Sequence, residues 1–167
     1  MIDISMAGAK IVLNAANGAQ NISSNPITEF SDEGTPIDIP SLEVAAGSMN
    51  MNGNLVTWTK PNPITVSFTL IPGSDSDTNL RSFLSSVSIG GRGNSVGEAY
   101  ITSMVITVPT YTDGSTSNKS DRIFTFTNGR LLSGQPAIGS NNDGKASPST
   151  WTFMFEGFKG VSQNKKK

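Results

Sequence analysis

The last apolar stretch of the chain alternates strictly, and this constrains the fold more than any other sequence feature. In STWTFMFEGFKG (149–160), Trp151, Phe153 and Phe155 occupy every second position, separated by threonine and methionine. Successive side chains of a β-strand point to opposite faces, so the pattern predicts a strand with three aromatic rings on one face. That face requires a hydrophobic core, whereas the opposite face requires a less apolar environment.

Further strands are predicted from the same period. ITVSFTL (64–70) alternates apolar with hydroxyl residues, and EAYITSMVITV (98–108) and RIFTFTNGRLL (122–132) are similar. Between two more candidate strands, Asn52-Gly53 is a strong signal for a hairpin turn. Strand segments dominate the chain. Their spacing predicts a mainly β fold, namely a small antiparallel β-barrel or sandwich with long loops.

One segment has the period of a helix instead. In DSDTNLRSFLSSVSI, apolar residues stand at i, i+3, i+4 and i+7, at Leu80, Phe83, Leu84 and Val87. This spacing is typical of an amphipathic helix, which we expect at about 77–88 with Asp77 or Thr78 as its N-cap. A glycine-rich stretch ends the helix after Ile89.

The apolar positions of these strands and of the helix predict the core of one protomer. The predicted core residues are Phe68, Leu80, Phe83, Leu84, Phe124, Phe126, Trp151, Phe153 and Phe155. The 167 residues fit a single domain, 1–167. A domain of this length buries roughly 70% of its unfolded surface, so it needs neither a disulfide nor a structural metal.

The sequence contains no histidine and no cysteine. Their absence removes the commonest general base, thiol nucleophiles and thiolate metal sites. Asp75, Asp77 and Asn79 imitate the start of a calcium loop, but leucine and serine stand at its sixth and twelfth positions. Glu156 has no evident carboxylate partner for acid–base work. We therefore expect no enzyme activity, no catalytic residue, no metal site and no cofactor.

Charged residues make up only 15% of the chain, against roughly 25% in an average soluble domain. Neutral polar residues replace them, which indicates a surface that is largely hidden in an assembly or that must not attract charged partners. The formal net charge is −1 even with three lysines at the end of the sequence, so no basic patch for gripping nucleic acid is evident. We expect 162–167 to be a flexible basic C-terminal tail.

A long polar run, about 14–41, follows the first predicted strand. Loops of this length are uncommon in compact domains and are often functional. Two interpretations stay open, a mobile surface loop or an extended arm that docks on a neighbouring subunit. The run has too many apolar residues for a free linker, which favours the arm. The predicted inter-subunit residues are Ile22, Ile27, Phe30 and Ile37.

The layout of these elements resembles the tail tube proteins of contractile-tailed bacteriophages, which share the Hcp-like fold of the type VI secretion tube. The resemblance rests on a first strand beginning almost at Met1, the long early arm, one helix after ITVSFTLIPGSDSDTNL, and a final W-x-F-x-F strand. It covers most of the chain and rests on layout instead of one diagnostic motif.

The resemblance implies a tail-tube-like barrel flanked by one helix, with six copies joined edge to edge in a ring. Stacked rings would form a hollow conduit for DNA ejection. The implied partners are further copies of the chain, the tail sheath, baseplate and tail-terminator proteins, and DNA that passes transiently and non-specifically. The monomer is not expected to insert into a membrane. The implied location is the virion tail, assembled in the host cytoplasm.

A bore that passes DNA must not hold phosphates, so hydroxyl-rich strand faces suit it better than basic ones. The candidate lumen residues are Thr65, Ser67, Thr69, Thr152 and Glu156.

A β-sandwich adhesion module or pilin-like structural module is the alternative from another class. Such modules are expected to carry a signal peptide and structural disulfides. Asp3 stands where a signal peptide would be positive, and the sequence has no cysteine. An enzyme built around Glu156 ranks third.

Overall fold

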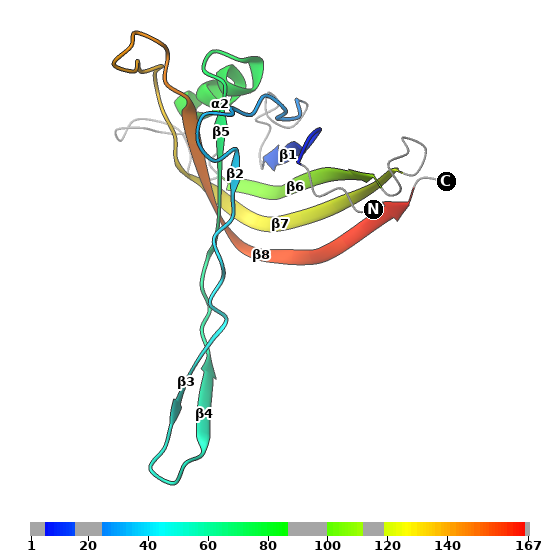
Figure 1. Ribbon diagram of the computed structural model, residues 1–167, viewed down its shortest axis with the longest axis vertical. Helices are drawn as coiled ribbons and strands as arrows, with labels where there is room; N and C mark the ends of the chain where they lie inside the picture. The colour runs from blue at the N-terminus through cyan, green and yellow to red at the C-terminus, as the bar shows by residue number, and fades with distance from the viewer. Residues whose placement is uncertain (1–5, 16–24, 87–99, 112–118, 166–167) are drawn as a thin grey trace.

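The computed structural model describes residues 6–15, 25–86, 100–111 and 119–165. Within these ranges it contains one helix and eight strands (Figure 1). The elements are β1 (Lys10–Ala15), β2 (Ile37–Asp38), β3 (Ala45–Met49), β4 (Leu55–Thr59), β5 (Ile64–Leu70), α2 (Asp75–Ser86), β6 (Tyr100–Tyr111), β7 (Lys119–Ser133) and β8 (Ser149–Lys165). The predicted mainly β fold with one helix is confirmed.

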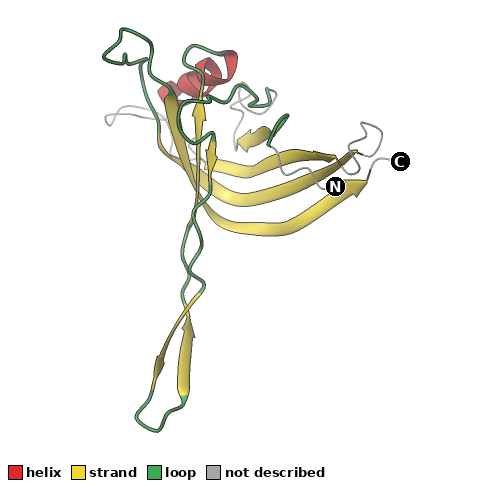
Figure 2. Ribbon diagram, in the orientation of Figure 1, coloured by secondary structure: helices red, strands yellow, loops and turns green. Residues whose placement is uncertain are grey.

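Six of these strands form one antiparallel sheet in the order β1-β6-β7-β8-β5-β2. The three longest, β6, β7 and β8, curve together across the body, while α2 lies toward one end (Figure 1). The other two strands, β3 and β4, pair only with each other and project from the body as a long ribbon (Figure 2). The described strands form a curved, sandwich-like sheet and do not close into a barrel.

The core lies between the main sheet, helix α2 and the segment that precedes β2. Phe68 of β5 stacks on Phe153 of β8 with ring centroids 5.7 Å apart, and Phe153 stacks on Phe155 at 6.4 Å. The core also contains Leu80, Phe83, Phe126 and Trp151, and Leu84 and Phe124 pack against it partly buried. All nine residues selected by alternation and helical spacing therefore lie in or against one apolar cluster.

Two glycines, one within β7 and one just after it, leave room for two aromatic rings of β8. A Cβ atom on Gly129 would stand 2.3 Å from the ring of Phe155, and one on Gly134 would stand 2.3 Å from the ring of Trp151. Real Cβ atoms do not approach ring carbons so closely, so any larger residue would displace these rings. Asn128, which precedes the first of these glycines, has a positive φ of 53°.

Helix α2 begins at Asp75, two residues earlier than predicted. The N-cap is Ser74, because its hydroxyl accepts the backbone N–H of Asp77 at 3.3 Å. The prediction of Asp77 or Thr78 as the cap is therefore wrong. Asp77 instead lies one turn inside the helix with its side chain fully buried. Val87, the last residue of the predicted apolar stripe, lies outside the described residues.

The described part of the predicted arm, residues 25–41, folds back onto the body and does not extend away from it. Ile27 exchanges two backbone hydrogen bonds with Ile11, of 2.7 and 3.0 Å, and Phe30 forms a bridge with Leu70 of β5. Ile27 is 4% exposed, so its predicted role as an inter-subunit contact is corrected to a core role. Phe30 and Ile37 pack partly buried against the same core, and Ile22 lies outside the described residues.

The predicted flexible tail at 162–167 is also corrected. Strand β8 continues to Lys165, which pairs with Ser120 of β7, and Ser162 pairs with Ile123. Backbone pairing therefore holds residues 162–165 in the sheet, because β7 is long enough to accompany β8 to this point. Residues 166–167 lie outside the described part of the chain.

The core role of Ile27 can be tested by substitution. Ile27→Ala removes a buried side chain and should lower the free energy of unfolding by about 2–5 kcal/mol. Ile39→Ala, at an exposed position, should change it by only about 0.5 kcal/mol or less. Urea unfolding of both variants measures the difference. A fully stable Ile27→Ala protein that fails to self-associate would restore the arm interpretation.

Candidate functional site

The most unusual surface of the molecule is the hairpin formed by β3 and β4. Its register pairs Ala46 with Trp58 and Ser48 with Val56. At the turn, the Asn50 side chain accepts the N–H groups of Asn52 and Asn54, at 3.1 and 2.8 Å, and Gly53 adopts a φ of 81°. The predicted turn at Asn52-Gly53 thus lies at the tip of a ribbon that projects from the body (Figure 1).

The hairpin contains no charged residue from 44 to 59. Its root is held by an ion pair of 3.1 Å between Lys60 and Glu43. Beyond that pair, the large apolar side chains are exposed, and Trp58 keeps 51% of its surface accessible. The exposed residues are Val44, Met49, Met51, Leu55, Val56 and Trp58.

A projecting ribbon of this kind contributes little to the folding stability of an isolated chain. A two-stranded hairpin without further packing is marginally stable in water, because it buries little apolar surface on either face. Exposed contiguous apolar surface marks an interaction site when it is not scattered. The uncharged, apolar hairpin is therefore a candidate interaction surface, and no other described strand pairs with it.

Strand β8 carries a second unpaired surface. On one side it pairs with β7 as far as Lys165, but on the other it pairs with β5 only as far as Phe155. From residue 156 to residue 165, no described strand accompanies this second edge. Phe158 lies on this stretch and is 62% exposed. A long free strand edge is a template for pairing with another chain.

The predicted lumen residues lie on the β5–β8 pair, opposite the aromatic core. Ser67 and Thr152 face each other with hydroxyl oxygens 3.1 Å apart, and both are partly buried, as is Thr65. Glu156 is exposed, at the point where β5 ends its pairing with β8. Thr69 departs from the group, because it is buried within the protomer and so cannot line an open bore.

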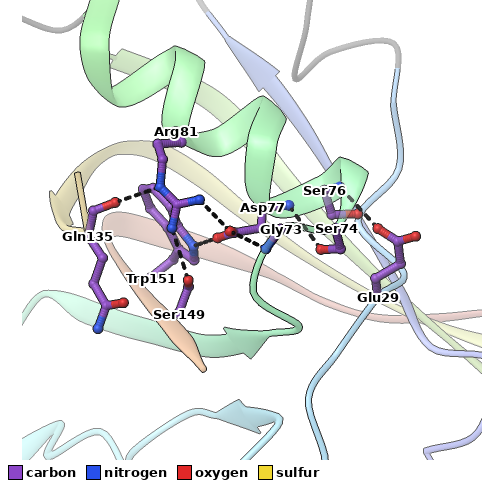
Figure 3. A network of polar contacts seen from close by, with 9 residues as sticks. All are labelled: Glu29, Gly73, Ser74, Ser76, Asp77, Arg81, Gln135, Ser149 and Trp151. Carbon is purple, nitrogen blue, oxygen red and sulfur yellow. Dashed lines mark hydrogen bonds and ion pairs between the residues drawn. The ribbon is translucent and has the colours of Figure 1, made fainter. Parts of the chain in front are cut away.

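A polar network joins helix α2 to β8 (Figure 3). The buried carboxylate of Asp77 accepts the indole N–H of Trp151 at 3.2 Å and the backbone N–H of Gly73 at 3.1 Å. Arg81, one turn further along α2, forms an ion pair of 2.5 Å with the same carboxylate. A buried charge requires a partner and hydrogen bonds of this kind.

Arg81 also reaches the two segments that flank the aromatic strand. Its guanidinium donates to the carbonyl of Gln135 at 3.2 Å and to the hydroxyl of Ser149 at 3.1 Å. At the helix start, the Glu29 carboxylate accepts the N–H of Ser76 at 3.1 Å. These contacts join helix α2 to strand β8, to the loop that contains Gln135 and to the segment that contains Glu29, which is a structural role.

A surface ion pair links the loop before β2 to the loop before β8. Lys145 donates to the carboxylate of Glu33, and this hydrogen bond and charge raise the pKa of Lys145 above its usual value. Because the pKa is raised on folding, the contribution of the pair is present at neutral pH and is lost as the pH rises through the pKa of Lys145. The pair is solvent-exposed and ties the loops only weakly.

The described residues hold no group of three or more acidic side chains placed to bind a metal ion. No described helix is long and apolar enough to cross a membrane. The features that remain are therefore surfaces: the hairpin, the free edge of β8 and the hydroxyl face.

Comparison with known families decides the class of protein. The family model for tail fiber protein gp32 matches residues 2–159, almost the whole chain. The chain belongs to this family. Among curated protein sequences there is no match.

Solved structures share the fold of this gp32-family chain. A chain of an extracellular contractile injection system, the PVC sheath/tube terminator in the extended state, has a TM-score of 0.52 at 13% identity, over 97% of this chain and 96% of that one. A chain of the PVC sheath-tube complex has a TM-score of 0.51 at 13% identity, over 98% and 93%. A chain of the anti-feeding prophage tube terminating cap has 0.50 at 11% identity, over 98% and 92%.

Sequence reasoning missed the hairpin as the exposed element of this family member. It found the turn, but it assigned the role of an arm to the preceding polar run. The available signal was the absence of charge over sixteen residues, together with four small residues in succession on β3, from Ala45 to Ser48. Small residues bury little surface, so β3 cannot anchor the hairpin to its own protomer.

The network predicts a large effect at Asp77. Asp77→Ala leaves the Arg81 guanidinium and the Trp151 N–H without their buried partner, and should lower the free energy of unfolding by about 3–5 kcal/mol. Asp75→Ala, in the same helical turn but exposed, removes only a helix-dipole interaction of about 0.3–1 kcal/mol. Denaturant unfolding followed by tryptophan fluorescence compares the two. Equal losses would show that the network adds nothing.

Proposed function

We propose that the chain is a structural subunit of the inner tail tube of a contractile particle, and has no catalytic role. In the proposed assembly, six copies join edge to edge into a ring, and rings stack into a conduit for DNA. Membership of the tail fiber protein gp32 family supports a place in a tail. The shared fold with chains of sheath-tube, terminator and cap assemblies is consistent with it.

The observation that carries the proposal is the unpaired edge of β8. Ten residues of strand, 156–165, present backbone groups on one side that no described strand satisfies. Joining sheets edge to edge around a ring would satisfy this edge in every copy, because a closed arrangement leaves no free end. A monomer would keep the edge open as an aggregation hazard.

The proposed partners beyond the chain itself are the sheath, baseplate and tail-terminator proteins, with assembly in the host cytoplasm before the particle is complete. A second candidate function is that of a terminator or cap subunit. Two of the solved structures with a similar fold favour it, because one is a tube terminating cap and one is a sheath/tube terminator. Electron microscopy of the purified protein separates the two. A tube subunit should give stacked rings of variable length, and a terminator should stop at single rings.

A charge on the free edge should block ring formation. Phe158→Lys places a lysine, which protects natural sheet edges from pairing, on the unpaired part of β8. We expect a folded monomer by size exclusion with light scattering. Leu132→Lys is the matched control, because Leu132 is also exposed, 57% against 62%, but lies near the end of β7. Rings formed by Phe158→Lys would refute edge-to-edge joining.

The hydroxyl face yields a test of the conduit. Thr152→Lys should fold and form tubes, but it would add one positive charge per subunit to the proposed bore. Such charges bind phosphate and should slow DNA release from assembled particles. Thr152→Gln is the neutral control of similar length. Normal release with lysines shown to line the bore would remove the electrostatic argument, and failure to assemble would place Thr152 in an interface.

A further inference from the structure

The sequence contains three Asn-Gly pairs, at 17–18, 52–53 and 128–129. An asparagine followed by glycine can modify itself, because the backbone nitrogen of the glycine can reach the side-chain carbonyl carbon of the asparagine. Glycine has no Cβ atom to hinder that approach. Asparagine is accordingly one of the thermally labile residues. The first pair lies outside the described residues, and the structure places the other two in contrasting surroundings.

We propose that Asn52-Gly53, at the apex of the β3–β4 hairpin, is a site of spontaneous deamidation in the folded protein. The Gly53 backbone nitrogen loses its proton and forms a bond to the side-chain carbonyl carbon of Asn52. The bond from that carbon to the side-chain nitrogen breaks, and ammonia leaves a cyclic succinimide. Water then opens the ring at either carbonyl, which gives aspartate or isoaspartate. The reaction consumes only water, and it is independent of the proposed function.

Both reacting groups are accessible at the apex. Asn52 and Gly53 are exposed, and a Cβ atom on Gly53 would meet nothing within 4 Å. The backbone N–H of Asn52 donates to the Asn50 side chain at 3.1 Å, but the Asn52 side-chain amide makes no hydrogen bond with any described residue. The neighbouring Asn54 is followed by leucine, whose branched side chain hinders the same attack. Asn52 is therefore the reactive asparagine of the turn.

One hydrogen bond opposes the reaction. The backbone N–H of Gly53 donates to the carbonyl of Asn50 at 3.0 Å, and this bond must open before the nitrogen can attack. Strands β3 and β4 pair only with each other, and a two-stranded hairpin of this kind is marginally stable. Its turn therefore opens at a lower free energy than the strands of the core.

The pair Asn128-Gly129 is protected by its place in the main sheet. Gly129 is buried, and it pairs with Ile101 of β6 on one side and with Phe155 of β8 on the other. A Cβ atom on Gly129 would stand 2.3 Å from the Phe155 ring, so the backbone there lies directly against the aromatic core. Closing a ring at Asn128 would require the central strands to separate. Asn128 thus serves as an internal control.

The loop before β8 contains an Asp-Gly pair in a similar turn. The N–H of Gly144 donates to the carbonyl of Asn141 at 3.0 Å, and Gly144 has a φ of 83°. The Asp143 side chain differs from that of Asn52, because its carboxylate accepts the N–H of Lys145 at 3.0 Å. The carbon of a carboxylate also resists a nucleophile more strongly than the carbon of an amide. Asn52 is therefore expected to react before Asp143.

Deamidation would change the character of the hairpin. Residues 44–59 contain no charged side chain, so each event adds the first negative charge to this exposed ribbon. Isoaspartate also adds one methylene to the backbone, which disturbs the alternation of side chains at the turn. Newly made and aged copies of the protein then present different surfaces at the same place.

The test is incubation of the full-length protein at neutral and at alkaline pH, in its native state and unfolded in urea. Peptide mapping by mass spectrometry measures the acid formed at each asparagine, and labelling by an isoaspartyl methyltransferase detects isoaspartate. In the native protein, acid should form at Asn52 at least about tenfold faster than at Asn128, because opening a core strand costs more free energy than opening the turn. The rate at Asn52 should rise with hydroxide concentration, since the attacking nitrogen must lose a proton.

Two variants assign the site. Asn52→Ser should abolish the isoaspartate label in the hairpin peptide, and serine is tolerated because Asn52 does not have a positive φ. Asn54→Ser is the matched control at the same apex, and it should keep the label.

Three results would overturn the proposal. Equal rates at Asn52 and Asn128 in the native protein would show that the fold does not select the hairpin. Deamidation of Asn52 only in urea would show that the bond from Gly53 to Asn50 protects the turn. An isoaspartate label that persists in the hairpin peptide of Asn52→Ser would assign the reaction to another residue.

Discussion

The antiparallel pairing of β5 with β8 is the interaction on which the rest of the protomer depends. It sets Val66 and Phe68 against Phe153 and Trp151, and it places the hydroxyls of Ser67 and Thr152 on the opposite face. The aromatic stack gives the sheet its buried side. Trp151 then fixes helix α2 through the carboxylate of Asp77. One strand pair therefore orders the core, the helix and the neutral outer face together.

The sequence predicted the parts of the structure that local periodicity determines. Alternation around Phe153 and Phe155 gave the final strand, and the spacing of Leu80 and Phe83 gave the helix, because a buried face must match the repeat of its backbone. The core residues followed from the same reasoning. The N-cap was misplaced because Asp77 is a good capping residue by type, and only tertiary contacts show that Trp151 and Arg81 use its carboxylate instead.

The candidate assembly surfaces were harder to predict because they depend on pairing between distant segments. Nothing local shows that Ile27 will bond to Ile11, or that β5 ends beside Phe155 while β8 continues. The first contact makes the segment around Ile27 fold back onto the body, and the second leaves one edge of β8 unpaired. The turn at Asn52-Gly53 was evident from the sequence. The projection of the hairpin from the body was not, because it depends on the absence of any described strand beside β3 and β4. Neutral residues such as Ala46 and Thr57 suit both a covered and an exposed ribbon.

The position of β8 within the sheet also constrains synthesis. Its neighbours in space are β7 on one side and β5 on the other, so β8 is the element that joins β1-β6-β7 to β5-β2. A nascent chain that has not yet emerged from the ribosome as far as β8 holds two unconnected groups of strands. Contacts between such distant segments form slowly. The protein therefore completes its main sheet only after β8 has been translated, which delays the appearance of the free β8 edge until that point.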